Sequence, residues 1–595
     1  MWWHREKNLP PGPSGWPVVG YLPHLGTEAY RTLHALTQKY GPTFSFYLGR
    51  KLVVVLGTFD AVKEGLTDSK ILDRPKNPPN HLLPDSTNLS VANGRAWKEQ
   101  RRFTIRVLRD LGMSKSRMEN IIQEELNKLI EIIDSKDGEA FNLDEIMLPS
   151  VSNIILTLLT GSPLDFKDKD RLFLNKMLQT MVLFFRPTRV HAFFPSLRQW
   201  LAKLKIWGYD RAEYYMEKFS NYIIAQIENH KKSVDSKERP DYINSYLLTL
   251  ESKKNCESSF SEKMLKGNFQ SLFSAGSTPS RATIEWCLLA MIRHPHIQRA
   301  VHEELDTLLP RNQPPTWKDH PNLPFTLSVV YEVLRHNSIV PIPLLRCTSE
   351  RTRISGHDVP KGTIVISNIW SVHHDPQHWE DPFTFNPERF LKDGKAVRPP
   401  TFMPFSYEKM LKGNFQSLFS AGTHSSRATV EWLPPRHDPP SPHPESRARG
   451  TGHSAAQKSA AHLEGPPQLA FKPCRGTSER TRISGHDVPK GTIVISNIWS
   501  VHHDPQHWED PFTFNPERFL KDGKAVRPPA FMPFSYGKRK CPGEDMAMAL
   551  VFLYFATLMQ RYTVSLPNEG TDVRQLLGVA NVALLEKVCL KKRFQ

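Results

Sequence analysis

Two segments of this 595-residue chain each occur twice, and the duplication limits how much of the chain one fold can use. The segment EKMLKGNFQSLFSAG fills residues 262–276 and recurs without change at 408–422, and residues 348–400 recur without change at 477–529. Independent domains rarely stay identical over such lengths, so we expect a recent duplication of a gene segment or an error in gene assembly. A single core has room for only one copy of each segment.

The two copies of the longer segment lead into different sequences. The first continues as FMPFSYEKMLKG at residues 402–413 and the second as FMPFSYGKRKCPGE at residues 531–544, so only the second reaches a cysteine. Excising residues 348–476 or residues 408–536 gives nearly the same polypeptide. We therefore expect one core built from residues 1–407 and 477–595, with one of the copies 348–407 and 477–536 redundant. The excluded strands and a redundant partial helix at 408–432 predict poor expression.

A polar segment separates the two copies. Residues 433–475 are rich in proline, histidine, serine and alanine and contain few large apolar side chains. Such a composition cannot bury enough apolar surface to offset the entropy that ordering would cost. The sequence therefore predicts a disordered, proline-rich linker over 433–475.

Outside this linker, helical patterns predominate over short β-rich runs. The run FSFYLGRKLVVVLG, residues 44–57, has two β-rich halves about a Gly-Arg pair and predicts a hairpin. Apolar residues at helical spacing predict helices over residues 118–135, 149–160, 211–230, 269–309 and 325–335. The sequence therefore predicts a mainly α fold with small β-sheets.

The distribution of charge bears on nucleic-acid binding, and the spacing of the cysteines bears on cellular location. Lysine and arginine exceed aspartate and glutamate by 17 residues, but the basic residues are scattered and form no long tract with interleaved aromatic residues. This distribution argues against nucleic-acid binding. The six cysteines lie far apart, without the spacing of a disulfide framework or a zinc site, so we expect a reducing, cytosol-facing location.

The sequence offers weak evidence for contact with a membrane. No run approaches the 18 or so apolar residues of a membrane span, and residues 1–17 lack the apolar region of a signal peptide, so no N-terminal anchor is expected in the sequence as written. Residues 191–208, HAFFPSLRQWLAKLKIWG, mix aromatic with basic side chains. Such a segment can rest in a bilayer interface or pack on the core, and both alternatives stay open.

The completed motif places five residues at the spacing F-x-x-G-x-R-x-C-x-G. They are Phe534, Gly537, Arg539, Cys541 and Gly543. If Cys541 is the axial thiolate ligand of a haem iron, the glycines let the backbone approach the metal, and Arg539 can pair with a haem propionate. A thiolate donates electron density to iron and favours O–O cleavage. The alternative is a buried free cysteine beside a basic turn.

This motif resembles the cysteine loop of the cytochrome P-450 superfamily, and the resemblance covers nearly all of the chain except the linker. Within the superfamily the chain is similar to the animal microsomal type, whose members oxidise lipophilic molecules. The resemblance implies the cytochrome P-450 fold, an α+β fold with one large haem domain. Its other signatures here are PPGPSGWPVVG (10–20), WKEQR (97–101), SAGSTPS (274–280), EVLR (332–335) and FNPERF (385–390 and 514–519).

Three further residues are expected to contact the haem propionates. Trp97 and Arg101 are four positions apart in a helical pattern, so their side chains project from one face of a helix. Arginine suits a carboxylate because its guanidinium is always charged and can donate two parallel hydrogen bonds. A solvated helix face is the alternative for this segment. By resemblance, Arg346 in PLLRCT is a further propionate contact.

The resemblance also implies a buried ionic network. Glu332 and Arg335 are one helical turn apart, and in the family such residues form a network with the arginine of PERF. Burying these charges is tolerable only when every partner is present. The chain offers two such arginines, Arg389 and Arg518, for a single EVLR. The alternative is an exposed ion pair worth about 0.5 kcal/mol or less.

A histidine-rich run precedes each PERF. In the first copy, HHDPQHWEDP contains His373, His374, Asp375 and His378, which could suggest a metal site. Histidines in a proline-containing loop are more often surface residues than ligands. We therefore expect irregular surface structure here rather than a metal centre.

The family carries A-G-x-acid-Thr in its central helix, where the acid and the threonine help to deliver protons to oxygen at the haem. In the first copy here the acid position holds Thr278 and the threonine position holds Pro279, which has no hydroxyl; Ser280 follows one residue later. The second copy places His424 at the acid position and Ser425 at the threonine position. We expect the first copy to form the core helix, with Thr278, Ser280 and Ser425 as candidates for the proton relay.

The resemblance implies a haem-thiolate monooxygenase that inserts one oxygen atom from O2 into a lipophilic small molecule such as a lipid, steroid or xenobiotic. It implies haem as the cofactor and electrons from NADPH through a cytochrome P-450 reductase, with cytochrome b5 as a further partner. It also implies the cytosolic face of the endoplasmic reticulum membrane, where the protein would contact the membrane surface.

Two other classes of function remain open. One is a catalytically impaired haem-binding protein or a misassembled duplicate, which the duplication and Pro279 favour. The other is an isomerase or dehydratase on the same scaffold that needs no external electrons.

Overall fold

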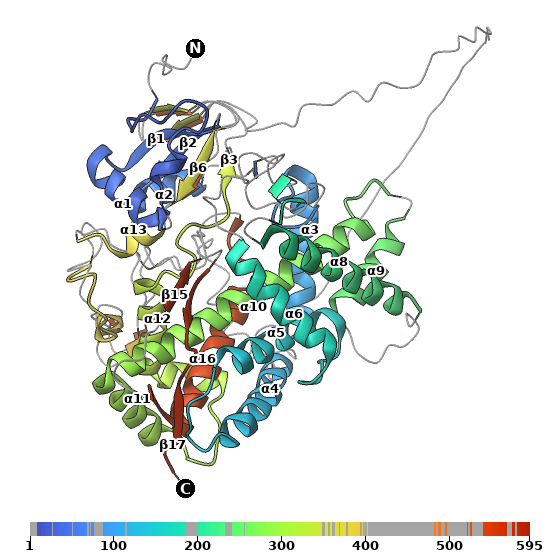
Figure 1. The fold of residues 1–595 in the computed structure, drawn as a ribbon, viewed down its shortest axis with the longest axis vertical. Helices are drawn as coiled ribbons and strands as arrows, with labels where there is room; N and C mark the ends of the chain where they lie inside the picture. The colour runs from blue at the N-terminus through green and yellow to red at the C-terminus, as the bar shows by residue number, and fades with distance from the viewer. Residues whose placement is uncertain are drawn as a thin grey trace, which may run out of the picture. The chain divides into compact units, whose positions relative to one another are not determined.

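Long helices make up most of the computed structural model of this chain. The strands β1, β2, β3 and β6 lie together near the N-terminus, whereas β17 lies near the C-terminus at the opposite end (Figure 1). All described residues belong to one compact unit, Met1–Glu408 with Arg475–Gln595. The predicted partial helix 408–432 and the predicted linker 433–475 lie outside the described residues. The structure describes residues 9–26, 28–49, 51–67, 71, 73–75, 87–112, 116–184, 200–201, 203–205, 208–232, 241–254, 256–347, 352–354, 357–359, 363–367, 369–376, 379–392, 395–396, 402, 481–483, 486–488, 494–496, 520–521, 524–525, 539–567, 574–577 and 580–594.

The helices follow the apolar patterns of the sequence closely. The helices are α1 (Ala29–Tyr40), α2 (Phe59–Thr67), α3 (Gly94–Asp110), α4 (Ser116–Asp134), α5 (Asp144–Thr160), α6 (Lys169–Phe184), α8 (Tyr209–Lys232), α9 (Tyr242–Ser252), α10 (Glu262–Arg293), α11 (Pro295–Leu308), α12 (Pro324–His336), α13 (Ile369–His373) and α16 (Glu544–Arg561). Single turns of 3-10 helix lie at Leu22–His24 and Glu388–Phe390, and a longer one at Trp317–Asn322.

One predicted helix is in fact two. Residues 269–309 were expected to be continuous, but α10 ends at Arg293 and α11 begins at Pro295. Proline has no N–H to continue α10 and disfavours helical geometry in the residue before it, and His294 has φ −127° and ψ 73°. By contrast, Pro149 and Pro279 lie inside α5 and α10. The predicted start of a helix at Pro149 was therefore five residues too late.

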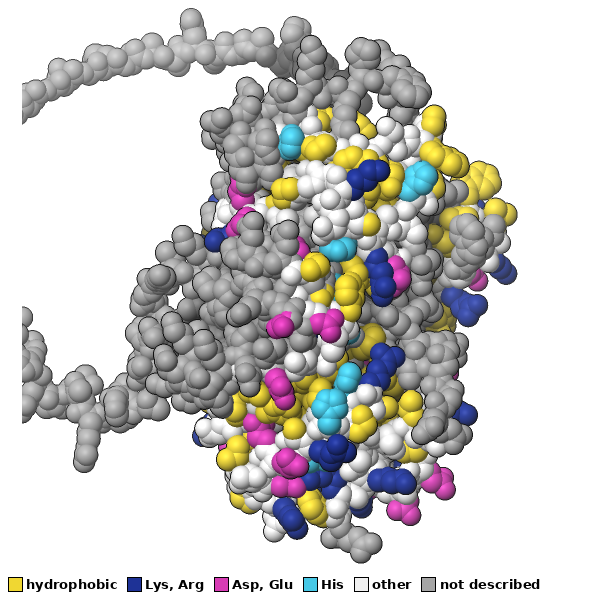
Figure 2. Space-filling model, turned by 90° about the vertical axis from the view of Figure 1, so that its left-hand side faces the viewer, with side chains coloured by type: hydrophobic (Ala, Val, Ile, Leu, Met, Phe, Trp, Pro, Cys, Tyr) yellow, Lys and Arg dark blue, Asp and Glu magenta, His cyan; other side chains and the backbone are white. Residues whose placement is uncertain are grey.

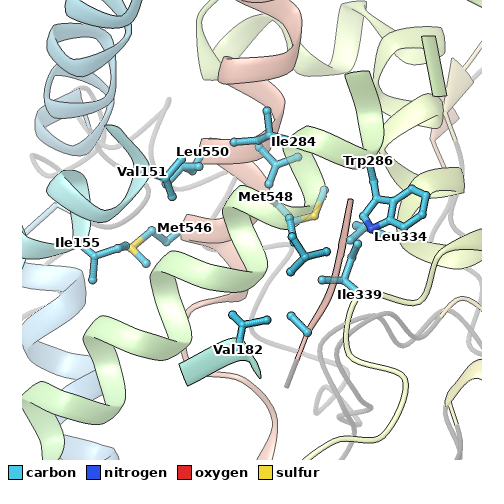
Figure 3. Close-up of a cluster of buried hydrophobic side chains, with 14 of the residues drawn as sticks. Val151, Ile155, Val182, Ile284, Trp286, Leu334, Ile339, Met546, Met548 and Leu550 are labelled. Atoms are coloured by element: carbon cyan, nitrogen blue, oxygen red, sulfur yellow. The ribbon is translucent and has the colours of Figure 1, made fainter. Parts of the chain in front are cut away.

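Three helices form the centre of the core. Helices α5, α10 and α16 carry long runs of buried residues, and α16 is buried almost throughout, as expected for a helix that is apolar on all sides. In Figure 3, Val151 of α5 lies beside Leu550 of α16 and near Ile284 of α10, and Ile155 of α5 lies beside Met546 of α16. This packing fixes the N-terminus of α16, which directly follows the cysteine loop.

The strands include both copies of the duplicated segment. They are β1 (Thr43–Leu48), β2 (Lys51–Leu56), β3 (Arg346–Cys347), β4 (Thr352–Ile354), β5 (His357–Val359), β6 (Ile364–Ser367), β7 (Leu391–Lys392), β8 (Lys395–Ala396), β9 (Thr481–Ile483), β10 (His486–Val488), β11 (Val494–Ser496), β12 (Leu520–Lys521), β13 (Lys524–Ala525), β14 (Tyr562–Ser565), β15 (Arg574–Leu577), β16 (Asn581–Leu584) and β17 (Cys589–Lys592). The predicted hairpin is confirmed: β1 pairs with β2 in antiparallel register from Thr43↔Leu56 to Leu48↔Lys51.

Equivalent strands of the two copies share sheets. The largest sheet has the order β1-β2-β11-β6-β3, with β6 from the first copy and β11 from the second, and β2 pairs in parallel with both. Thr352 pairs with Thr481 and Ile366 with Ile495, its counterpart in the other copy in each case. Because the two copies have the same sequence, local strand propensity cannot distinguish them.

A buried ionic network includes the PERF arginine of the first copy. The guanidinium of Arg335 donates from Nε and Nη2 to the two carboxylate oxygens of Glu332, both at 2.5 Å, and Nε of Arg389 lies 2.8 Å from Oε1 of Glu332. All three side chains are fully buried. Arg389 also donates to the carbonyls of Glu380 and Thr384 at 2.9 Å. The network therefore contains the arginine of the first copy, and Arg518 lies outside the described residues.

The described surface carries charges of both signs. On the face shown in Figure 2, Lys and Arg side chains are interspersed with Asp and Glu side chains. Most of residues 191–208 lies outside the described residues, but Trp200 and Leu204 are 66% and 61% exposed. In the part of the chain that the structure describes, no helix is both long and apolar enough to cross a membrane.

The network predicts that the two PERF arginines are not equivalent. We expect Arg389→Ala to lower the free energy of unfolding by about 3–5 kcal/mol, because it leaves Glu332 buried with one partner fewer. The matched variant Arg518→Ala is expected to change it by less than about 0.5 kcal/mol. Urea unfolding followed by circular dichroism measures both. Equal effects, or a large effect only in the double variant, would show that the two copies exchange in the core.

Candidate functional site

Cys541 lies at the point where the cysteine loop meets α16. Gly543 is the N-cap of this helix, and α16 begins at Glu544. The side chain of Cys541 is exposed, whereas the α16 residues that follow it are mostly buried. A Cβ atom at Gly543 would lie 4.0 Å from Sγ of Cys541, so the backbone passes close to the sulfur. The loop thus presents a thiol on the end of a rigid core element.

The surroundings of Cys541 act on its protonation in opposite directions. Although Cys541 is exposed as a residue, protein atoms pack around its thiol, and this burial raises the pKa of the thiol, with a further contribution from the carboxylate of Glu544. A hydrogen bond from the backbone N–H of Gly543 and the cations of Arg101 and Lys540 favour the thiolate. The N-terminus of a helix also favours negative charge. A metal ion bound at the sulfur would complete the deprotonation.

Arg539, two residues before the cysteine, is buried and held on two sides. Its Nη2 donates to the carbonyl of Ala92 at 2.6 Å and to Oδ1 of Asn93 at 3.0 Å. Its guanidinium carbon lies 4.0 Å from the centroid of the Trp97 ring, a cation–π distance. Trp97 is itself buried in the first turn of α3, with 5% of its surface exposed. The predicted Trp97 and Arg539 therefore lie in direct contact.

Four arginines gather around this point. Arg346, in β3, and Arg539 are buried, and burial lowers the pKa of both well below the ordinary value. Arg74 and Arg101 lower these pKa values further, because like charges repel. Asp73 is the acid that opposes the shift at Arg539. The cluster of Arg74, Arg101, Arg346 and Arg539 therefore carries an excess of positive charge beside Cys541.

The residues present fit a haem with two propionates. The buried Nε and Nη1 atoms of Arg539 have no hydrogen-bond partner among the described residues. Buried cationic donors are costly unless an anion accepts their hydrogen bonds. A dianionic ligand near Cys541 would satisfy these donors and reduce the repulsion within the arginine cluster, while the exposed sulfur is available to a metal. Arg539, Arg346, Arg101 and Trp97 would hold the propionates, and Cys541 the iron.

The proton-relay candidates lie on the central helix. α10 contains the first copy, and Thr278 and Ser280 are buried on either side of Pro279. The hydroxyl of Ser277 donates to the carbonyl of Phe273 at 2.7 Å, and that of Thr283 to the carbonyl of Pro279 at 2.8 Å. The hydroxyls of Ser277 and Thr283, which lie near the candidates on the same helix, are therefore bound to backbone carbonyls of α10.

Several predicted residues cannot be placed. Phe534 and Gly537 of the cysteine loop, Arg518 of the second PERF and Ser425 of the second central segment lie outside the described residues. Their expected roles stay predictions. Gly543, by contrast, is described as the N-cap of α16.

Three members of the histidine-rich run are buried, so the prediction of surface structure was wrong for them, and His378 lies outside the described residues. His373, His374 and Asp375 are buried, with 0%, 3% and 6% of their surfaces exposed. Arg335 donates to the carbonyl of His373 at 2.7 Å, which ties the run to the ionic network. Within the described residues, no group of three or more His, Cys, Asp or Glu side chains could hold a metal ion. His373, His374 and Asp375 therefore belong to the buried core next to the ionic network.

Sequence reasoning missed two residues of this site, Arg74 and Asn93. Arg74 donates from Nη1 to the carbonyls of Leu344 and Leu345 at 2.7 and 2.9 Å, and burial lowers its pKa to about 10. Asn93 accepts hydrogen bonds from both Arg74 and Arg539. Neither residue belongs to a periodic pattern, and the only local signals were a charged residue before Pro75 and an Asn-Gly pair.

Comparison with known proteins agrees with this geometry. A sequence profile of the cytochrome P450 family matches residues 10–407 and 470–590. The chain is 32% identical over 434 residues to cytochrome P450 2J5 of Mus musculus, which covers 70% of this chain and 85% of the mouse protein. It is also 32% identical to cytochrome P450 2U1 of Bos taurus, over 69% of this chain and 80% of that protein, and to cytochrome P450 2J2 of Homo sapiens, over 68% and 81%.

The buried histidines predict how stability depends on pH. Burial, with Arg335 and three neighbouring histidines, His34, His336 and His373, holds the pKa of His374 well below its ordinary value. The unfolded chain therefore binds more protons as the pH falls below about 6.5, and stability is lost, at up to about 1.4 kcal/mol per pH unit for each such histidine. We expect His374→Phe to make the fall between pH 7 and 5 shallower by about one proton.

Urea unfolding at a series of pH values measures this slope. His296→Gln is the matched control, because His296 is exposed on α11 and its replacement should leave the slope unchanged. An unchanged slope in His374→Phe would contradict the burial of a neutral imidazole at this position.

Proposed function

The chain belongs to the cytochrome P450 family of monooxygenases, and from this premise we propose that it inserts one oxygen atom from O2 into a lipophilic small molecule, with Cys541 as the thiolate ligand of a haem. The observation that carries the proposal is the group of buried arginines beside Cys541, an exposed residue at the start of α16. Haem supplies dioxygen and electron-transfer chemistry when bound through a thiolate.

The residues of the chain supply binding and orientation. Arg346 and Arg539 are preorganised cationic donors: Arg346 is held in β3, and Arg539 is held by the Trp97 ring, the carbonyl of Ala92 and Oδ1 of Asn93 before any ligand arrives. Preorganised donors bind an anion without the cost of ordering flexible side chains. Gly543 donates its N–H to the sulfur of Cys541, which holds negative charge on that atom.

Proton delivery is the step at which this chain departs most from its family. We propose that Thr278 and Ser280, buried on α10, supply the hydroxyls nearest to the usual relay position. Pro279 supplies neither a hydroxyl nor a backbone N–H there. Ser425, in the second copy, is the remaining candidate by sequence alone. Product formation is therefore expected to be poorly coupled to electron supply.

The finer features of the function follow from the family resemblance. We propose that electrons come from NADPH through a cytochrome P-450 reductase, with cytochrome b5 as a further partner. We also propose that the protein acts at the cytosolic face of the endoplasmic reticulum membrane. The exposed side chains of Trp200 and Leu204 support contact with a membrane surface, because aromatic and apolar side chains favour the bilayer interface.

A second candidate function is a haem-binding protein with impaired catalysis, which Pro279 favours. The two readings are separated by turnover of the purified full-length chain with NADPH, a reductase and a panel of lipophilic substrates under 18O2. We expect one labelled oxygen atom in the product and no product without reductase. Haem binding without any product would support the impaired protein, and turnover without reductase would support an isomerase or dehydratase.

The proton-relay proposal predicts a gain of function. We expect Pro279→Thr to raise the fraction of NADPH electrons recovered in product by about tenfold, because a positioned proton donor contributes at least that much. Pro279→Ala is the matched control, since it restores the backbone N–H but no hydroxyl. The ratio of product formed to NADPH consumed measures the effect. The proposal fails if the alanine and threonine variants have the same ratio.

A further inference from the structure

Asn93 stands at the start of α3 but does not cap that helix. It occupies the N-cap position with φ −123° and ψ 165°, the backbone geometry of a capping residue, yet its side chain makes no cap hydrogen bond. Asparagine is among the best N-cap residues, and an unused cap leaves helix N–H groups without that partner. Gly94, which follows, has φ 59° and so leads the chain into the helix through a left-handed turn. The side chain of Asn93 is therefore used for something else.

Among the described residues, the side chain of Asn93 forms hydrogen bonds with Arg74 and Arg539 of the arginine cluster. Its Oδ1 accepts from the backbone N–H of Arg74 at 2.7 Å and from Nη2 of Arg539 at 3.0 Å, and its Nδ2 donates to the carbonyl of Arg74 at 2.9 Å. Arg74 in turn donates from Nε to the carbonyl of Ser90 at 3.0 Å. One amide thus links two cationic residues that lie 465 positions apart.

We propose that Asn93 is a positioning residue that aims the guanidinium of Arg539 at the haem propionate. This inference rests on the proposed haem site. The Nη2 atom of Arg539 donates to Ala92 and Asn93, and one face of its guanidinium lies against the Trp97 ring. The atoms of Arg539 left for an anion are therefore Nε and Nη1. Asn93 therefore decides which donors of Arg539 remain available and where they point.

The chemistry of this position favours asparagine over its close relatives. It needs an acceptor for Arg539 and for the N–H of Arg74, and a donor for the carbonyl of Arg74. Aspartate would lose the donor and add a negative charge that competes with a propionate for Arg539. Serine is a good N-cap, but its single short hydroxyl cannot replace both ends of the amide.

The test compares haem retention with protein stability in the full-length chain. We expect Asn93→Ala to lose haem to an apo-globin scavenger about tenfold faster than wild type, because a hydrogen bond to a charged group is lost. Asn93→Ser should lose haem equally fast, while the chain prepared without haem unfolds at the same temperature or higher, because serine can cap α3. A purely structural role for Asn93 would move both readouts in the same direction.

Asn88→Ala is the matched control. Asn88 is half-buried in the same loop and accepts hydrogen bonds from the N–H groups of Ser90 and Val91. In the part of the chain that the structure describes, it bonds to neither Arg74 nor Arg539. We expect this variant to keep the wild-type rate of haem loss. Wild-type rates in both Asn93 variants, or an equal acceleration in Asn88→Ala, would overturn the inference.

Failure of the proposed function has a different signature. In that case the wild-type chain, loaded with haem, reduced and exposed to carbon monoxide, would lack the spectrum of a thiolate-ligated haem, and the inference about Asn93 would fall with it. If wild type has that spectrum and Asn93→Ala retains haem normally, only the inference about Asn93 is wrong.

Discussion

The site depends on one electrostatic constraint, the crowding of buried arginines beside Cys541. Arg346 and Arg539 are removed from water and placed near two further arginines, so the pKa of each is lowered and like charges repel one another in the described part of the site. Such an arrangement is stable only because the rest of the fold over-determines it. The core helix α16 fixes Cys541, the sheet fixes Arg346, and α3 supplies Trp97 as a surface for Arg539. An anion that accepts from these donors relieves a cost that folding has already incurred.

The parts of the site with a local sequence signal were predictable, and the parts without one were not. The spacing around Cys541 and the pair Trp97 and Arg101 stand out because each motif lies within a few positions of the chain. Arg74 and Asn93 were not predicted, because Arg74 bonds to Leu344 and Asn93 bonds to Arg539, in each case across hundreds of residues of the chain. The same difference explains the fold. Helices with strong apolar periodicity, such as α4 and α8, lie where the sequence predicted them, whereas Pro149 was misjudged because tertiary packing tolerates a proline within α5.

In the duplicated segments, local sequence cannot predict which copy enters the core. Both copies of the longer segment have the same sequence and therefore the same propensities, and equivalent strands of the two pair with each other and with β2. Only a partner present once can select between them. Glu332 is such a partner, and in the described residues it pairs with Arg389. The burial of His373 and His374 beneath this network was likewise hidden, because a histidine-rich run looks polar until its neighbours are known.

The central claim is that the sulfur of Cys541 is the axial ligand of a haem held by the arginine cluster. The most direct measurement is the absorption spectrum of the reduced, carbon monoxide-treated protein, recorded for wild type and for Cys541→Ser at equal haem content. We expect the red-shifted Soret band of a thiolate-ligated haem in wild type and its loss in the serine variant. The same band in both proteins would contradict ligation of the haem iron by Cys541.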